Sequence, residues 1–172
     1  MPRSLIAIGC ACLVASAVFA GGASAQRGVS GLDKEYLKTS MQGDIFEITG
    51  GKLARVKTHN RAVLTMANRL VSDHTKSLRD AARLARRLGV EVPKSPTPSE
   101  TWELQVVRSL SGRSFDHWCS RLEVYDHLQD IDETTSEIQD GSNGAVRAEA
   151  KTDLPMLRTH LKLARIAAAA SP

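Results

Sequence analysis

Leu70-Val71-Ser72-Asp73-His74-Thr75 and Glu123-Val124-Tyr125-Asp126-His127-Leu128 are the two stretches that decide the fold. Both contain Val-x-Asp-His, and each lies in the middle of a segment whose apolar residues recur every three or four positions. That period is typical of an amphipathic helix. Two helices with the same mid-helix histidine predict a chain built as two similar helical hairpins.

The apolar stripe around His74 is the clearest in the chain. It runs over residues 63–88 and has His74 at its centre. Asn60 precedes the stripe as an N-cap and Gly89 follows it as a terminator, which predicts a helix over residues 60–88. We interpret the basic residues of the opposite face as a solvated surface and expect no nucleic-acid binding, because no aromatic residues are interleaved with them. These residues are Lys76, Arg79, Arg83 and Arg87.

The preceding segment predicts a helix from Asp33, a good N-cap, to about residue 57. One of its faces is apolar and carries Leu37, Met41, Ile45, Ile48 and Val56. The opposite face carries small residues, with Glu47 in their middle. Glycine inside a helix costs about 1 kcal/mol relative to alanine. The pair Gly50-Gly51 therefore predicts close helix packing or a local kink.

Prolines at positions 93, 96 and 98 predict a long non-helical crossover after the second helix. A helix should then begin at Ser99 or Thr101 and break at Ser111-Gly112. A longer helix is expected over residues 114–139, buried on different sides at its two ends. Its first half would bury Phe115, Trp118, Cys119, Leu122 and Tyr125, and its second half Val124, His127, Ile131, Thr135 and Ile138. We expect Trp102 and Trp118 to be core anchors.

The last predicted helix covers residues 145–169, with His160 at the edge of its apolar stripe and a kink at Pro155. No strand pattern competes anywhere, and aromatic residues make up only 4% of the chain, which argues against a β-sandwich. The sequence therefore predicts an all-α fold.

Residues 1–25 resemble a secretory signal peptide. Arg3 is followed by an apolar run and by a small-x-small cleavage site that ends at Ala25. We therefore expect a flexible tail over residues 26–32, a helical domain over residues 33–170, no transmembrane segment, and a periplasmic or secreted location. Loss of Arg3 would lower the formal charge from +4 to +3, a mildly basic balance. Cys119 would be the one cysteine left in the mature chain, and we expect it to be buried and inert.

Several short motifs resemble the bacterial family catalogued as domain of unknown function 4142. They are Gln42-Gly43, Lys52-Leu53, Leu70-Val71-x-Asp73-His74-Thr75-Lys76, Leu110-Ser111-Gly112, Phe115-Asp116, Val124-x-Asp126-His127 and Leu154-Pro155-x-Leu157-x-x-His160-Leu161. The resemblance covers roughly residues 33 to 168. It implies an exported, ferritin-like four-helix bundle with a long crossover between its second and third long helices. It implies no established activity.

Each of the four long helices offers one polar group near the middle of the bundle: Glu47, His74, His127 and His160. Bundle cores hold metals through inward side chains. Three neutral imidazoles and a carboxylate suit Zn²⁺, Fe²⁺ or Mn²⁺. Asp73 and Asp126 could then hydrogen-bond to the ligating imidazoles from behind.

The residues around the histidines oppose an iron enzyme of the ferritin type. Such sites use Glu-x-x-His twice, whereas Val71, Val124 and Leu157 precede the three histidines by three positions. The alternative is a structural network in which the histidines fix helix register and Glu47 pairs with His74 or Lys52.

Two hypotheses about function remain. The first is a non-enzymatic helical bundle of the cell envelope, which acts through an unknown envelope protein or small ligand or in a stress response. The second is a ferritin-like metal-binding protein. No catalytic residue is assigned, because the sequence contains no nucleophile elbow, phosphate loop or Cys-x-x-Cys motif.

Overall fold

Five α-helices make up the described part of the chain. The computed structural model describes residues 28–172, so the predicted signal peptide lies outside the described residues. The helices are α1 (Gly31–Lys57), α2 (Arg61–Leu88), α3 (Pro98–Ser109), α4 (Gly112–Asp140) and α5 (Gly144–Ala169). Residues 28–172 contain no strand, which confirms the predicted all-α class. Within the same residues, no helix has both the length and the apolar character that crossing a membrane requires.

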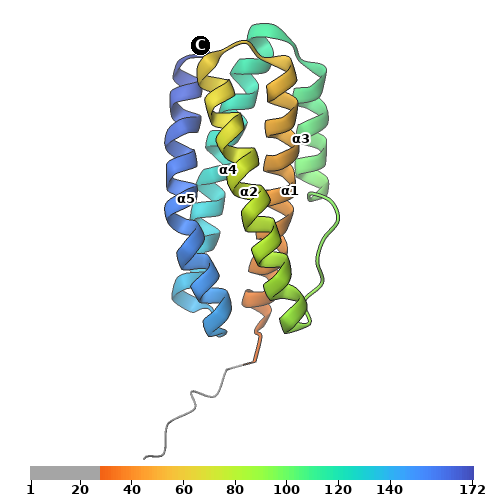
Figure 1. Ribbon diagram of the computed structural model, residues 1–172, viewed down its shortest axis with the longest axis vertical. Coiled ribbons are helices and arrows are strands. Elements are labelled where there is room, and N and C mark those ends of the chain that lie inside the picture. The colour runs from red at the N-terminus through yellow and green to blue at the C-terminus, as the bar shows by residue number, and fades with distance from the viewer. Residues whose placement is uncertain (1–27) are drawn as a thin grey trace, which may run out of the picture.

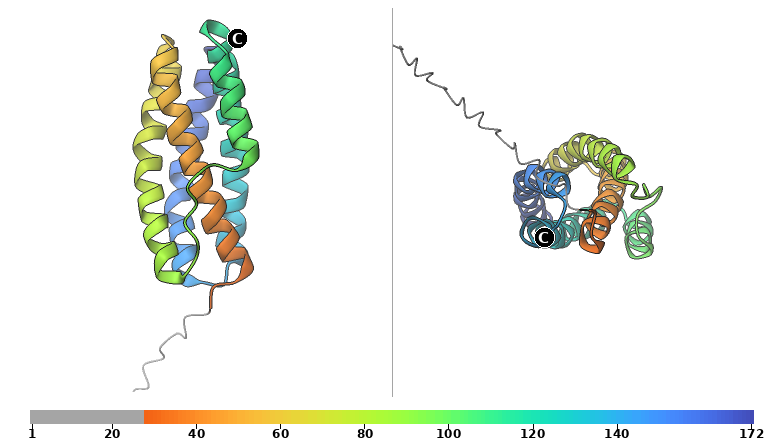
Figure 2. Two further views of the ribbon diagram at one scale, coloured as in Figure 1. Left: turned by 90° about the vertical axis from the view of Figure 1, so that its right-hand side faces the viewer. Right: turned by 90° about the horizontal axis from the view of Figure 1, so that it is seen from below.

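The four long helices lie side by side, and the short α3 packs outside them against α1 and α4 (Figures 1 and 2). α1 and α2 form one antiparallel pair, and α4 and α5 form the other. The loop over residues 89–97 and α3 carry the chain back along the length of the four helices. α2 and α4 therefore run in the same direction. The two Val-x-Asp-His motifs therefore lie on the second helix of one pair and the first helix of the other. The prediction that they mark two similar hairpins is wrong.

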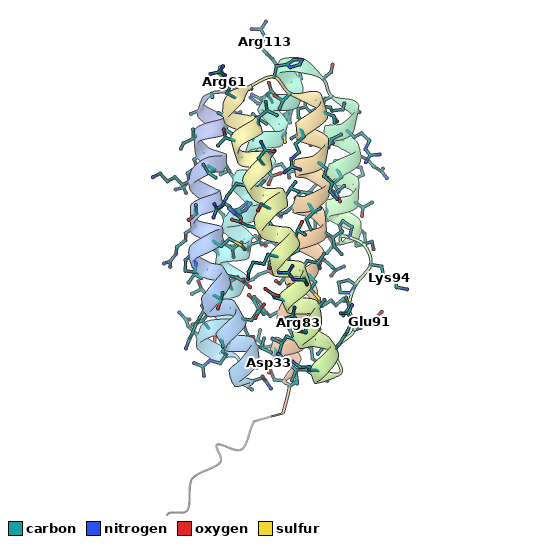
Figure 3. The ribbon with its side chains drawn as sticks, in the orientation of Figure 1. Asp33, Arg61, Arg83, Glu91, Lys94 and Arg113 are labelled. Atoms are coloured by element: carbon teal, nitrogen blue, oxygen red, sulfur yellow. The ribbon has the colours of Figure 1, made fainter. Side chains whose placement is uncertain are left out.

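The starts of α1, α3 and α4 differ from the predicted ones, whereas α2 has the predicted N-cap, Asn60. Asp33 is not the N-cap of α1: Ser30 is, and Asp33 closes a capping box three residues later. The same carboxylate accepts from the main-chain N–H groups of Ser142 and Asn143 at 2.9 Å each, and so ties α1 to the α4–α5 loop. Figure 3 shows Asp33 at the opposite end of the molecule from Arg61 and Arg113. Thr97 caps α3 in the same way, and α4 begins at Gly112.

The apolar core is divided into two clusters. One contains Ala54, Val63, Met66, Ala67, Leu70, Val107, Phe115, Cys119, Ala164 and Ala167. The other contains Tyr36, Leu37, Met41, Ala81, Ala82, Leu84, Ala85, Val146 and Ala150. Burying a leucine-sized side chain contributes about 1.5–3 kcal/mol. The two clusters can thus stabilise the fold while the layer between them is polar. Cys119 is buried in the first cluster, as predicted.

The buried stripe of α4 stays on one side of the helix, contrary to the predicted change of face. It is apolar at first and polar later, and consists of Phe115, Cys119, Ser120, Glu123, His127, Thr134 and Glu137. Trp118 and Tyr125 are 57% and 67% exposed, and Trp102 is 65% exposed, so neither tryptophan is a core anchor. Val56, predicted to face inward, is exposed as well. The apolar pattern predicted the wrong inward face of α4, because buried carboxyl and imidazole groups occupy its inward positions.

Gly51 accounts for the closest approach of α1 to α2. A Cβ atom at this position would lie 2.7 Å from Val71 Cγ2 and 3.0 Å from the main-chain oxygen of Ala67. Both distances are shorter than normal contacts, so only glycine fits without movement of α2. The predicted close packing at Gly50-Gly51 is confirmed at the second residue of the pair.

Candidate metal centre

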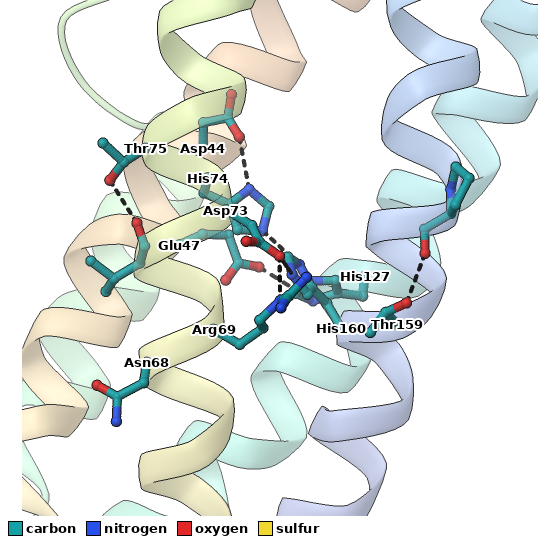
Figure 4. Close-up of polar contacts among 12 residues, drawn as sticks. Asp44, Glu47, Asn68, Arg69, Asp73, His74, Thr75, His127, Thr159 and His160 are labelled. Carbon is teal, nitrogen blue, oxygen red and sulfur yellow. Dashed lines mark hydrogen bonds and ion pairs between the residues drawn. The ribbon is translucent and has the colours of Figure 1, made fainter.

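Three imidazoles from three helices meet in the polar layer. His74 lies on α2, His127 on α4 and His160 on α5, and Figure 4 shows the three rings turned toward one another. The ring centroids are 4.9 Å apart for His74 and His160, 5.4 Å for His127 and His160, and 5.8 Å for His74 and His127. One ring nitrogen from each lies within 4.8 Å of the others, and no ring is more than 2% exposed.

Each imidazole has one nitrogen directed at an oxygen atom. His74 Nδ1 lies 2.7 Å from Asp44 Oδ1 on α1. His160 Nε2 lies 3.0 Å from Asp73 Oδ2. His127 Nδ1 lies 2.8 Å from the main-chain oxygen of Glu123, one turn earlier on α4. Oxygen acceptors of this kind fix the tautomer and orientation of metal-ligating histidines.

The nitrogens on the other side of the rings face inward. The main-chain oxygen of Glu123 only accepts, so His127 carries its proton on Nδ1 and leaves a lone pair on Nε2. Nε2 has no hydrogen-bond partner in the described part of the chain. Asp73 is paired with Arg69 Nε at 2.6 Å and accepts from His160 Nε2, which leaves the lone pair of His160 on Nδ1. That Nδ1 lies 3.1 Å from His74 Nε2.

Burial keeps all three imidazoles uncharged. It lowers the pKa of His74 and His160 to about 4 and that of His127 to about 3. The neighbouring imidazoles lower the pKa of His127 and His160 further. Neutral imidazole is the form that binds metal ions.

A group of carboxyl side chains adjoins the imidazoles. Glu47 on α1 is fully buried, and its Oε1 lies 3.3 Å from His127 Nδ1. Single oxygens of Glu47, Asp126 and Asp130 lie within 4.8 Å of one another, as do ligand atoms of Glu47, Glu123 and His127. Glu47 thus belongs to both sets.

Burial raises the pKa of five carboxyl groups in this region: Asp44, Glu47, Glu123, Asp126 and Asp130. The pKa of Glu47 is well above its usual range because of burial and then because of the charges of Glu123 and Asp126. Burial raises the pKa of Glu123 to about 8 and that of Asp126 to about 6. The pKa of Asp44 and Asp130 is also well above the usual range, with burial as the main cause.

The predicted site residues are distributed over two neighbouring groups. His74, His127 and His160 form the first group, with Asp73 behind His160. Glu47 does not share a group with all three imidazoles, and contacts His127 rather than His74 or Lys52. Asp126, predicted to lie behind His127, groups with Glu47 instead.

Three carboxyl groups in the polar layer were not singled out from the sequence: Asp44, Glu123 and Asp130. The residues Glu123, Asp126, His127 and Asp130 follow the spacing of one helix face. Asp44 and Glu47 lie three positions apart on α1, which also places them on one side. Polar residues at helical spacing were therefore the signal that could have identified them.

The donor set fits a divalent transition metal. Zn–N bonds of about 2.0–2.1 Å in a tetrahedron separate two ligand nitrogens by about 3.3 Å. The distance of 3.1 Å between His74 Nε2 and His160 Nδ1 is close to that value. Three imidazoles would occupy three positions and leave one for another ligand.

A small cavity reaches this centre from the side of α1, α4 and α5. Its volume is about 20 Å³, enough for one water molecule. Asp44, His74, Asp130, Glu133 and Asp153 are among its lining residues. A hydrated ion could approach through this acidic passage only if the side chains move.

A protein-family model described as "Domain of unknown function (DUF4142)" matches residues 19–166. This match agrees with the motifs found in the sequence. No curated protein and no solved structure matches the chain.

Proposed function

The chain belongs to the DUF4142 family, a family without an assigned activity, and on this premise we propose that it binds a divalent transition-metal ion through His74, His127 and His160. We further propose that the protein is exported and that its fold is a ferritin-like four-helix bundle. Zn²⁺, Fe²⁺ and Mn²⁺ are the ions that the donor set favours.

The observation that carries the proposal is the unpartnered Nε2 atom of His127. The residue is fully buried, and its Nδ1 proton is already directed at a main-chain oxygen. A buried polar atom without a partner costs about 1–3 kcal/mol. A network that only fixed helix register would satisfy its members, so a bound cation explains this arrangement better than a purely structural role.

The chain Asp44–His74–His160–Asp73 predicts how metal binding would depend on pH. Without an ion, protonated Asp44 can donate to His74 Nδ1, and His74 Nε2 can donate to His160 Nδ1. With an ion between the rings, both inward nitrogens must offer lone pairs. The proton on the Asp44–His74 pair is then released, and ionised Asp44 accepts from His74 Nδ1. Binding would therefore release a proton and strengthen as the pH rises.

Ferritin-like folds are four-helix bundles with one long crossover connection. Four long helices side by side, with α3 and a nine-residue loop between α2 and α4, support this assignment. The signal-peptide pattern of residues 1–25 supports export. Detection of a mature chain that begins at Gln26 in the envelope fraction of the host would test it.

Burial favours holding an ion over turnover of an organic substrate. The three rings are at most 2% exposed, and the adjoining cavity has room for about one water molecule. A buried site of this size suits a protein that stores or delivers a metal ion, or a protein whose own fold the ion stabilises.

The test is metal analysis of the mature chain, purified without a histidine tag and loaded with Zn²⁺, Fe²⁺ or Mn²⁺. We expect one tightly bound transition-metal ion at the imidazoles, and a melting temperature that falls when a chelator removes it. His127→Gln should lose this ion, while His59→Gln, a change at an exposed histidine, should keep it. Equal metal content in both variants would refute the proposal.

A further inference from the structure

A second cluster of ionisable side chains, made of carboxyl groups, lies on the α1–α4 side of the polar layer. Glu123, Asp126 and Asp130 lie on one face of α4, at intervals of three and four residues, and Glu47 faces them from α1. Glu47 and Glu123 are at most 2% exposed. This group contains only oxygen donors, in contrast to the imidazole centre.

The group has no basic partner. Among residues 28–172, no lysine or arginine nitrogen lies within 4.0 Å of an oxygen of Glu47, Glu123, Asp126 or Asp130. His127 is the one neighbour at such a distance, and its Nδ1 proton points mainly at a main-chain oxygen. Four acidic groups are thus collected without a compensating cation from the chain.

Glu47 supplies an observation that is independent of the clustering. The side chain is fully buried, and within the described residues no donor group of the chain hydrogen-bonds to Oε1 or Oε2. Its polar neighbours are the carboxyl groups of Glu123 and Asp126. Glu123 Oε2 and Asp126 Oδ2 also lack partners. Buried carboxyl groups are normally paired, hydrogen-bonded or bound to a metal ion.

Two glycines of α1 mark where the carboxyl groups of α4 lie against this helix, at ordinary contact distances. A Cβ atom on Gly50 would lie 3.5 Å from Glu123 Oε1, and one on Gly43 would lie 3.7 Å from Asp130 Oδ1. The two positions lie about one turn on either side of Glu47. The carboxyl groups of α4 are therefore directed against the backbone of α1 rather than into solvent.

We propose that Glu47, Asp126 and Asp130, whose ligand oxygens lie within 4.8 Å of one another, hold a second divalent cation, of the hard class that prefers oxygen ligands, such as Mn²⁺, Mg²⁺ or Ca²⁺. Carboxylate oxygens are the ligands these ions favour. His127 Nδ1 donates its proton to the main-chain oxygen of Glu123 and does not ligate the ion, but it lies 3.3 Å from Glu47 Oε1, so the two centres adjoin. The site goes beyond the imidazole centre and does not depend on it.

The test uses the full mature chain in a His74→Gln/His160→Gln background, which removes the imidazole centre. We expect this protein, stripped with chelator, to bind one Mn²⁺ ion in a titration followed by electron paramagnetic resonance. Adding Asp126→Asn and Asp130→Asn should weaken binding by about 100-fold or more, because two charged ligands are lost. Asp132→Asn, an exposed position on the same helix, is the matched control and should leave the affinity unchanged.

A parallel titration of the wild-type chain with Ca²⁺ keeps the proposal testable if the imidazole variant does not fold. Ca²⁺ takes oxygen ligands, so its binding reports the carboxyl group alone. A cooperative rise in melting temperature with Ca²⁺, absent in Asp126→Asn/Asp130→Asn, supports the site. Folded protein that binds neither Mn²⁺ nor Ca²⁺, or binds them equally in both variants, overturns it. Loss of Zn²⁺ binding in His127→Gln is a separate result that tests the imidazole centre.

Discussion

Asp44 on α1 lies 2.7 Å from His74 Nδ1 on α2, and both side chains are almost completely buried. A carboxyl group in this position sets which nitrogen of the ring carries the proton. It connects a helix that supplies no imidazole to the candidate metal centre. The pair is therefore the most direct way to test how the surroundings of the three rings control metal binding.

Replacing Asp44 with asparagine should weaken transition-metal binding by about 10- to 100-fold, the usual effect of losing a partner behind a ligating histidine. The amide oxygen can still accept from His74 Nδ1, so the ring should remain in place. Because no acidic proton remains to be displaced, the variant should release one proton fewer per ion bound. Competition with a chromogenic chelator measures the affinity, and a pH indicator in weak buffer measures the protons. Unchanged affinity together with unchanged proton release would contradict the role given to Asp44.

The metal-free protein should lose stability as the pH rises above about 6.5. Burial raises the pKa of Asp44, Glu47, Glu123 and Asp130, so the folded chain holds protons there that the unfolded chain has lost. The free energy of unfolding then falls with rising pH, by up to about 1.4 kcal/mol per pH unit for each such group. Glu123, with a pKa of about 8, extends the fall to that pH.

The imidazoles act in the opposite direction at lower pH. Burial lowers the pKa of His74, His127 and His160, so below about 6.5 the unfolded chain takes up protons that the folded chain does not. The two effects oppose each other below pH 6.5, and only the carboxyl effect remains above it. Melting curves of chelator-treated protein between pH 6.5 and 8.5 provide the check. Glu123→Gln should make the decline shallower, and a melting temperature that rises over this range would show the assignment to be wrong.

Gly51→Ala should destabilise the fold, and Gly43→Ala should not. The new methyl group at position 51 would meet Val71 Cγ2 at 2.7 Å, which forces α1 and α2 apart at a cost of about 1–3 kcal/mol. At position 43 the nearest atom would be 3.7 Å away, so the gain in helix propensity of about 1 kcal/mol prevails. Urea denaturation of both variants measures the difference. Equal stability of the two would mean that α2 yields easily at this contact.

The two tryptophans should be accessible to a soluble quencher in the native protein. Trp102 and Trp118 are 65% and 57% exposed and lie beside one another on α3 and α4, around an apolar surface that also includes Val106 and Leu122. Acrylamide should therefore quench the fluorescence of folded protein nearly as strongly as that of the urea-unfolded chain. Strong protection in the folded state would indicate that another molecule or a second copy covers this surface.

The sequence predicted the helices well because their apolar stripes and breakers are explicit. The stripe around His74 and the break at Ser111-Gly112 both have counterparts in the structure. The prediction failed on α4, where inward positions after Cys119 are occupied by Glu123 and His127. A search for apolar residues at helical spacing then selects the exposed side, as it did for Tyr125.

The sequence singled out the three imidazoles of the candidate site but not most of its carboxyl groups. His74, His127 and His160 could be placed at one level, because each lies near the middle of a long helix. Asp44 could not be assigned to His74 from the sequence, because the rotation of α1 about its own axis is set by packing. That packing depends on Gly51 and on the two apolar clusters, which are tertiary features.

A single connection after α2 joins residues 28–88 to residues 112–172. Since His74 comes from the first part and His127 and His160 from the second, neither part alone contains a complete set of imidazoles. The proposed ion would therefore cross-link the two parts in addition to the apolar cluster that they share. A protein cut within residues 89–97 should accordingly separate into its fragments more readily after chelation than with the ion bound.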